Sequence, residues 1–142
     1  GDARVVLDAR NLHGTREVFG APMVPGACLF AAQEVLARQG AMVQATTNAV
    51  VRALKWLRTA GPRDLVANVP DALQFVDHAL FLAGVMRNRE GMSPDGAFPA
   101  DGARQLLRHL AEVDPSLRSE DLDVARAYTG DFVRRARERY QA

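Results

Sequence analysis

The residues of this chain that could bind a metal ion or act as nucleophiles are few and far apart. His13, His78 and His109 form neither a His-x-x-x-His pair nor any other cluster with the spacing of metal ligands. Cys28, the single cysteine, lies in an apolar run, where a thiol ordinarily serves as a small buried hydrophobe. Cys28 with His13 as its base is the alternative, but no feature of the sequence activates the thiol. We therefore expect no metal site, no cofactor and no catalytic residue, and so a protein that is not an enzyme.

The glycines and carboxylates also lack the patterns of phosphate-binding and hydrolytic sites. The chain contains no Gly-x-Gly-x-x-Gly and no Gly-Lys-Ser/Thr sequence, so nothing indicates nucleotide binding. Most aspartates stand near expected helix starts or turns, where capping of backbone N–H groups explains them. The 18 basic and 17 acidic residues give a net charge of +1, which argues against nucleic acid as a partner.

The elements that must position any site are two short strands followed by about six helices. Apolar runs at residues 4–8 and 27–31 predict the strands. Apolar residues at helical spacing, separated by glycine and proline, predict the helices. These are expected at residues 32–39, 42–58, 63–67, 70–86, 99–113 and 121–140. Trp56 and Tyr128 stand among apolar residues in these helices, which favours core packing over ligand stacking.

Two strands alone do not form a stable sheet. We therefore expect the 142 residues to be the carboxy-terminal portion of a larger, mostly helical α/β protein whose other strands lie outside this chain. The chain should then pack against that missing amino-terminal part of the same protein, or self-associate. Its longest apolar stretch, residues 79–86, is far shorter than the ~20 residues of a membrane-spanning helix and indicates a buried core helix.

Six segments of the chain, taken in order, carry a resemblance to a known family. They are the run at residues 4–8, Phe-Gly-x-Pro at 19–22, Cys-Leu-Phe-Ala at 28–31, Asn-Ala-Val-Val-Arg-Ala-Leu-Lys-Trp-Leu at 48–57, Ser-Pro-Asp-Gly at 93–96 and Ala-Tyr-Thr-Gly-Asp-Phe-Val at 127–133. Together they resemble the final part of periplasmic solute-binding proteins of ABC importers, in the nitrate, sulfonate, taurine and thiamin-pyrimidine-precursor subgroup. The resemblance implies a two-lobed periplasmic-binding-protein fold of type II. Residues 1–26 would end the second lobe and form the hinge crossover, and residues 27–142 would be the carboxy-terminal part of the first lobe.

The same resemblance implies a function in transport. The chain would belong to the solute-binding component of an ABC importer, which binds a small organic or anionic nutrient between its lobes and then docks on the transporter permease. Such a protein is periplasmic, or exported and membrane-associated. One alternative is an enzyme of the same fold, similar to the thiamin-pyrimidine-precursor synthase, which needs a reactive histidine and a cofactor-binding lysine. Lys55, the only lysine, lies inside an expected helix, with no loop to present it. Another alternative is a helical interaction module without a small ligand.

The loop at residues 19–25 is the segment where a binding role competes with a structural one. If it joins strands of different lobes, it lies at the cleft, and its apolar composition suits an organic ligand. We predict that Phe19 and Met23 contact the organic portion of the ligand. Arg16, with Thr15 beside it, is the expected donor to an acidic group, since a guanidinium binds a carboxylate or sulfonate through two hydrogen bonds. The alternative is a plain crossover whose glycines and prolines only shape the turn.

Overall fold

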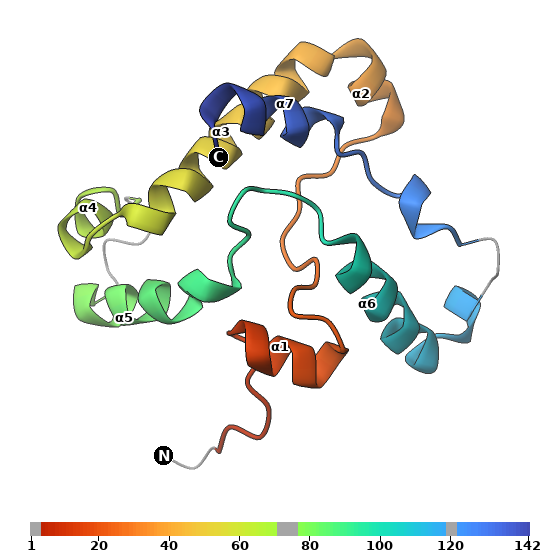
Figure 1. Cartoon of the computed structure of the whole chain (residues 1–142), viewed down its shortest axis with the longest axis horizontal. Helices are drawn as coiled ribbons and strands as arrows, with labels where there is room; N and C mark the ends of the chain where they lie inside the picture. The colour runs from red at the N-terminus through yellow and green to blue at the C-terminus, as the bar shows by residue number, and fades with distance from the viewer. Residues whose placement is uncertain (1–3, 71–76, 119–121) are drawn as a thin grey trace.

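The computed structural model describes residues 4–70, 77–118 and 122–142, and in these ranges every regular element is a helix. The α-helices are α1 (Leu12–Phe19), α2 (Gln33–Arg38), α3 (Gly40–Thr59), α4 (Pro62–Ala67), α5 (His78–Asn88), α6 (Ala100–Val113) and α7 (Asp131–Tyr140). Short 3-10 helices are η2 (Arg89–Gly91), η3 (Pro115–Arg118) and η4 (Val124–Arg126). The helices lie around two irregular segments, residues 20–32 and 92–99, which run through the middle of the molecule (Figure 1).

The predicted fold class is wrong. We expected two short strands and a mostly helical α/β portion of a two-lobed fold, but no residue of the described ranges lies in a strand. The runs at residues 4–8 and 27–31 are irregular, and Figure 1 shows them apart, one near the amino terminus and one leading to α2. A strand requires a hydrogen-bonded neighbour, and neither run has one among the described residues. Apolar composition alone therefore misled the prediction.

The helix predictions were more successful. The helices expected at residues 32–39, 42–58, 63–67 and 99–113 are confirmed as α2, α3, α4 and α6. Part of the helix expected at residues 70–86 lies outside the described residues, and α5 begins after Asp77, whose carboxylate accepts hydrogen bonds from the N–H groups of Ala79 and Leu80. The single helix expected at residues 121–140 is wrong, because η4 and α7 are separate and Gly130 stands at the start of α7.

Helix α1 was not predicted, since it falls within the segment expected to be a hinge crossover. Its amino terminus is capped by Asn11, whose side-chain oxygen accepts a 2.8 Å hydrogen bond from the Gly14 N–H. Its last turn closes where the Gly20 N–H donates to the Arg16 carbonyl at 2.8 Å. An asparagine before the first turn and a glycine after the last one are ordinary helix boundary signals. The segment was misassigned because its glycines were taken only as turn residues.

The best-packed part of the molecule is the contact of α3 with α7 and with the turn at residues 93–96. Val51 of α3 is only 1% exposed, and it is the largest fully buried side chain in the described ranges. Gly96 has φ of 79°, and a Cβ there would lie 3.2 Å from Val51 Cγ2 and 3.3 Å from Val133 Cγ2. Only glycine adopts this left-handed backbone easily and leaves room for both valines.

Polar contacts hold the same pair of helices together. Gln44 of α3 donates to the carbonyl of Phe132 at 2.9 Å and accepts from Arg135 Nε at 2.7 Å. Lys55 Nζ donates to the carbonyls of Tyr140 and Gln141 at 2.6 and 3.2 Å, where α7 ends. A cation is favourable there because a helix carboxy terminus leaves its last carbonyls unsatisfied and partially negative.

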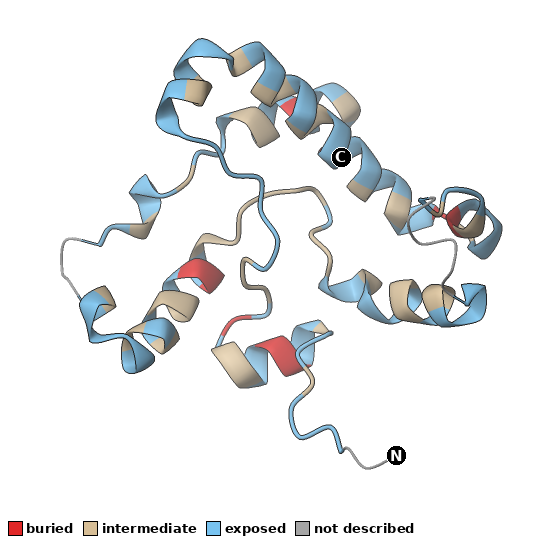
Figure 2. Ribbon diagram, turned by 180° about the vertical axis from the view of Figure 1, so that it is seen from behind, coloured by how far each residue is buried: buried red, intermediate tan, exposed pale blue. Residues whose placement is uncertain are grey.

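Elsewhere the packing is sparse, and the described residues share no common core. Helix α1 packs on α6, α4 packs on α5, and α2 packs on α3, as separate groups (Figure 1). Figure 2 shows buried residues only at isolated points of the ribbon. The buried apolar residues are Ala21, Val51, Ala60, Leu65, Ala103 and Ala136, of which four are alanines. The interior therefore excludes little apolar surface from water.

The expectation that Trp56 packs in the core is wrong. Its side chain is 39% exposed. At 3.6 residues per turn, Trp56 lies about 140° around α3 from Val51, and so away from the face that α7 covers. Tyr128 is half-buried and stacks on Phe98 with ring centroids 4.3 Å apart, which agrees with the packing role expected for it.

We predict that Gly96→Ala destabilises the protein by about 1–2 kcal/mol or more, because the new Cβ must occupy a left-handed position against two valines. Denaturant unfolding measures the change. Gly84→Ala is the matched control: no atom lies within 4 Å of a Cβ at Gly84, which is inside α5. That substitution should stabilise by up to about 1 kcal/mol through helix propensity. Equal effects of the two substitutions would contradict the packing described at Gly96.

Candidate functional site

A cleft of about 330 Å³ lies where the loop after α1, the end of α3 and the segment after α5 meet. Its lining residues are Leu12, Met23, Arg58, Arg89, Glu90, Met92 and Pro94. Two guanidinium groups, one carboxylate and four apolar side chains thus come together from four separate segments. The cleft is shallow and open, but small-molecule sites also combine an apolar wall with a few charged groups.

Met23 reaches the cleft because its loop is held against the start of α6. A Cβ on Gly102 would lie 1.8 Å from the Met23 carbonyl oxygen and 2.9 Å from Val24 Cα. No other residue than glycine allows the backbone of residues 23–24 to approach α6 so closely. Gly102 and its neighbour Ala103 are both buried at this contact. The loop is therefore fixed by backbone packing, and the side chain of Met23 remains half-buried in the cleft wall.

Arg89 joins the cleft to the end of α3. Its Nη2 donates a 2.8 Å hydrogen bond to the carbonyl of Ala60, the residue that ends α3. Its Nε is buried and has no hydrogen-bond partner among the described residues. A buried donor without an acceptor is costly, and more so on a charged group. The Arg89 Nε is therefore, among the described residues, an unsatisfied donor that is closed off from solvent, and it is not presented to the cleft.

Arg58 supplies the second positive charge from the last turn of α3. Its side chain is exposed, and no ion pair joins it or Arg89 to another of the described residues. A planar guanidinium binds a carboxylate or sulfonate through two parallel hydrogen bonds. With Met23, Met92 and Leu12 alongside, the cleft fits an organic anion better than a bare inorganic ion. Glu90 adds one acidic group that favours a positive or hydrogen-donating part of the same ligand.

The structure separates the three residues that the sequence predicted as ligand contacts. Met23 lines the cleft. Phe19 instead packs its ring edge-on against His109 of α6, with centroids 6.0 Å apart. Arg16 is exposed on α1 and is not among the lining residues. Arg58 and Arg89 were not predicted, because 30 intervening positions hide any local motif and only the fold brings them together.

The histidines and Cys28 are not among the residues that line the cleft. No three His, Cys, Asp or Glu side chains of the described part of the chain are grouped so as to hold a metal ion. Cys28 is exposed, which corrects the expectation of a buried thiol. His13 faces Glu17 at 3.5 Å on α1, so its neighbour is a carboxylate one helical turn away. Among the described helices, none has the length and apolar character needed to cross a bilayer.

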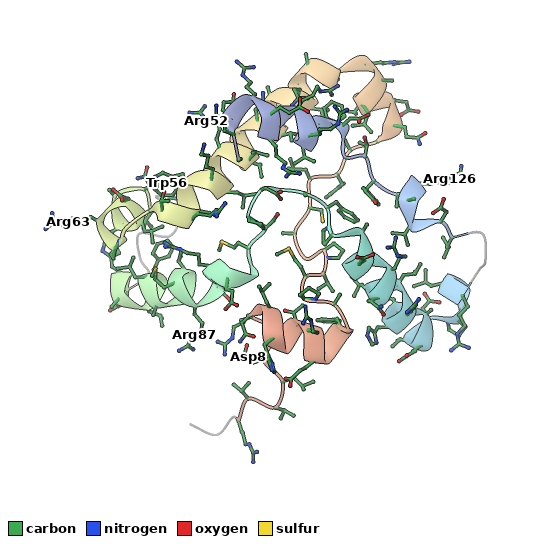
Figure 3. All side chains as sticks on the ribbon, viewed as in Figure 1. Asp8, Arg52, Trp56, Arg63, Arg87 and Arg126 are labelled. Carbon is green, nitrogen blue, oxygen red and sulfur yellow. The ribbon has the colours of Figure 1, made fainter. Side chains whose placement is uncertain are left out.

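Asp8 has the most perturbed environment among the described carboxylates. Hydrogen bonds from the Arg10 side chain, at 2.7 Å from Nε, and from the Arg10 backbone N–H, at 3.1 Å, lower the pKa of Asp8 from 3.8 to about 2. The charge of Arg87 acts in the same direction, and Figure 3 shows Arg87 of α5 near Asp8. This pair lies before α1, outside the cleft, so we assign it a local structural role.

The Asp8 carboxylate should titrate with a midpoint near pH 2 in a carbon-13 NMR experiment. Because the folded pKa lies below the ordinary value, the stabilising effect of the pair is present above about pH 4 and is lost as the pH falls toward 2. Arg10→Gln should raise the midpoint, since the charged donor is removed while the backbone donor remains. A midpoint that is the same in both proteins would show that Arg10 does not determine it.

Comparison with known proteins gives one informative match. No protein-family model matches the chain, and no curated protein matches it. A solved structure of a protein from Bordetella bronchiseptica RB50 is similar, with 38% sequence identity and a TM-score of 0.88 over 98% of this chain. The chain spans 43% of the length of that protein. The same arrangement of helices therefore occurs as part of a polypeptide more than twice as long.

Proposed function

We propose that this chain is part of the solute-binding component of an ABC importer and that its ligand is a small organic anion. The observation that carries the proposal is the cleft in which Met23 lies with Arg58 and Arg89. The resemblance of six sequence segments to periplasmic solute-binding proteins suggested this function, although the runs at residues 4–8 and 28–31 are not the strands that the resemblance implied. The protein would be periplasmic, or exported and membrane-associated, and its macromolecular partner would be the transporter permease.

The mechanism follows from differential binding and involves no bond formation or cleavage. Apolar contacts at Met23 and Met92 would hold the organic portion of the ligand, and a guanidinium would take its acidic group. The cleft is open on the part of the protein described, so the remainder of the longer polypeptide would complete the enclosure. Ligand binding would stabilise the liganded state of the protein, and the permease would recognise that state.

The enzyme alternative receives no support from the residues that it needs. The Lys55 ammonium group donates hydrogen bonds to the carbonyls of Tyr140 and Gln141 at the end of α7, and so caps that helix. A lysine held in this way is not placed to bind a cofactor. The solute-binding proposal requires no reactive lysine, and we therefore prefer it.

Arg58→Gln in the longer protein should weaken the binding of a carboxylate or sulfonate ligand by about 1.5–3 kcal/mol, the value of a hydrogen bond to a charged group. The corresponding uncharged amide should bind equally well to both proteins. Isothermal titration calorimetry with paired acids and amides measures the difference. Arg16→Gln is the matched control, since Arg16 is exposed on α1 and does not line the cleft. If only Arg16→Gln weakened the acids, the donor predicted from the sequence would be the right one.

Met23→Ala should weaken ligands with an apolar portion by about 1–3 kcal/mol through lost burial of that side chain against the ligand. The loop backbone is held by its contact with Gly102, so the free energy of unfolding should change much less than the affinity. Met42→Ala provides the control, because Met42 is 53% exposed on α3 and does not line the cleft. Unchanged affinity in Met23→Ala would exclude the cleft as the binding site.

A further inference from the structure

We propose that the exposed apolar runs at residues 5–7 and 28–30 pack against the remaining part of one longer polypeptide, on an apolar surface of that part. In the described structure Val5, Val6 and Leu7 are 66%, 86% and 71% exposed. Leu29 and Phe30 are 58% and 97% exposed, and Cys28 beside them is also exposed. Single exposed apolar residues are ordinary, but consecutive ones mark interaction surfaces.

The total exposed surface of the chain is larger than that of a compact protein of the same mass. The chain exposes 10599 Å², whereas a compact monomer of 15.5 kDa exposes about 7,200 Å². The excess over that value, about 3,400 Å², is several times the ~800 Å² that each partner contributes to an interface of standard size. An area of this size is typical of parts of one folded unit rather than of a transient contact.

The length of the related protein indicates where a covering surface can come from. In the Bordetella bronchiseptica protein this arrangement of helices recurs in a chain of which it covers 43%, so more than half of that polypeptide lies outside the match. The residues outside the match belong to the same polypeptide there, so a covering surface could come from them without a second copy. Charge does not select the partner, because the net charge of this chain is only +1. The contact should therefore be apolar, and the remaining polypeptide should provide it. This inference goes beyond the proposed function and does not depend on it.

The thiol of Cys28 tests the proposal, because it is the only cysteine of the chain and lies next to Leu29 and Phe30. In the longer gene product that contains this chain, a maleimide should label Cys28 at least about 100-fold more slowly in buffer than in denaturant, since a packed thiol reacts only when the contact opens. Peptide mass mapping separates Cys28 from cysteines elsewhere. Glu112→Cys in a Cys28→Ala background is the control, because Glu112 is exposed on α6 and should be labelled rapidly in both conditions.

Three results would overturn the proposal. Rapid labelling of Cys28 in the folded longer protein would show that the run at residues 28–30 is not covered. Slow labelling that becomes fast on dilution would assign the covering to a second copy. A gene that encodes no more than these residues would remove the occupant altogether.

Phe30→Ser provides a second and independent measurement. An almost fully exposed phenylalanine can be replaced at little cost, so the described structure alone predicts no change in thermal stability. In the longer protein we expect a melting temperature lower by several degrees, because a packed aromatic is lost. Glu34→Ser, an exposed substitution on the neighbouring α2, should leave the melting temperature nearly unchanged. Equal melting temperatures for the two variants would overturn the proposal at Phe30.

Discussion

The close contact of Gly96 with Val51 and Val133 is the constraint on which the arrangement of helices depends. It is the one place where α3, α7 and the middle segment of the chain meet with a fully buried side chain between them. The turn is itself braced, because the Gly96 N–H donates to Ser93 Oγ at 2.9 Å and Asp95 forms a 3.0 Å ion pair with Arg137 of α7. Local hydrogen bonds thus set the backbone conformation that the valines require.

The positions of the residues that line the cleft depend on this contact. Pro94 belongs to the braced turn, and Met92 lies two residues before it, so one wall is fixed against α3 and α7. The end of α3 carries Arg58 and the Ala60 carbonyl that accepts a hydrogen bond from Arg89. The cleft wall formed by these two arginines is therefore positioned by α3 as well. Met23 approaches from the opposite direction and is held by Gly102. The close approaches at Gly96 and Gly102, together with the hydrogen bond from the Arg89 side chain to the Ala60 carbonyl, therefore place the charged and apolar groups of the cleft.

The sequence predicted helices, which depend on neighbouring residues. It did not predict the features that depend on contacts between distant residues. Helices α3 and α6 were predicted because apolar periodicity and glycine or proline boundaries are local signals. The apolar composition of the runs at residues 4–8 and 27–31 predicts strands, but a strand also needs a hydrogen-bonded partner, which only tertiary structure supplies. Met23 was selected from its loop, but Arg58 and Arg89 carry no sequence motif. They become neighbours only because Arg89 caps α3 at Ala60.

The described part of the chain buries few side chains, and this affects both its stability and its exposed apolar surface. A chain with few buried side chains has little apolar burial to offset the entropy of ordering its helices. The buried Nε of Arg89 adds a cost, because it finds no acceptor among the described residues. The apolar surface proposed above would reduce the first of these deficits, because it would bury side chains that the described part of the chain leaves exposed. Because the Arg89 Nε is closed off from solvent while the Arg58 side chain is exposed at the cleft, the affinity for an anion should depend on Arg58 rather than on relief of the buried donor.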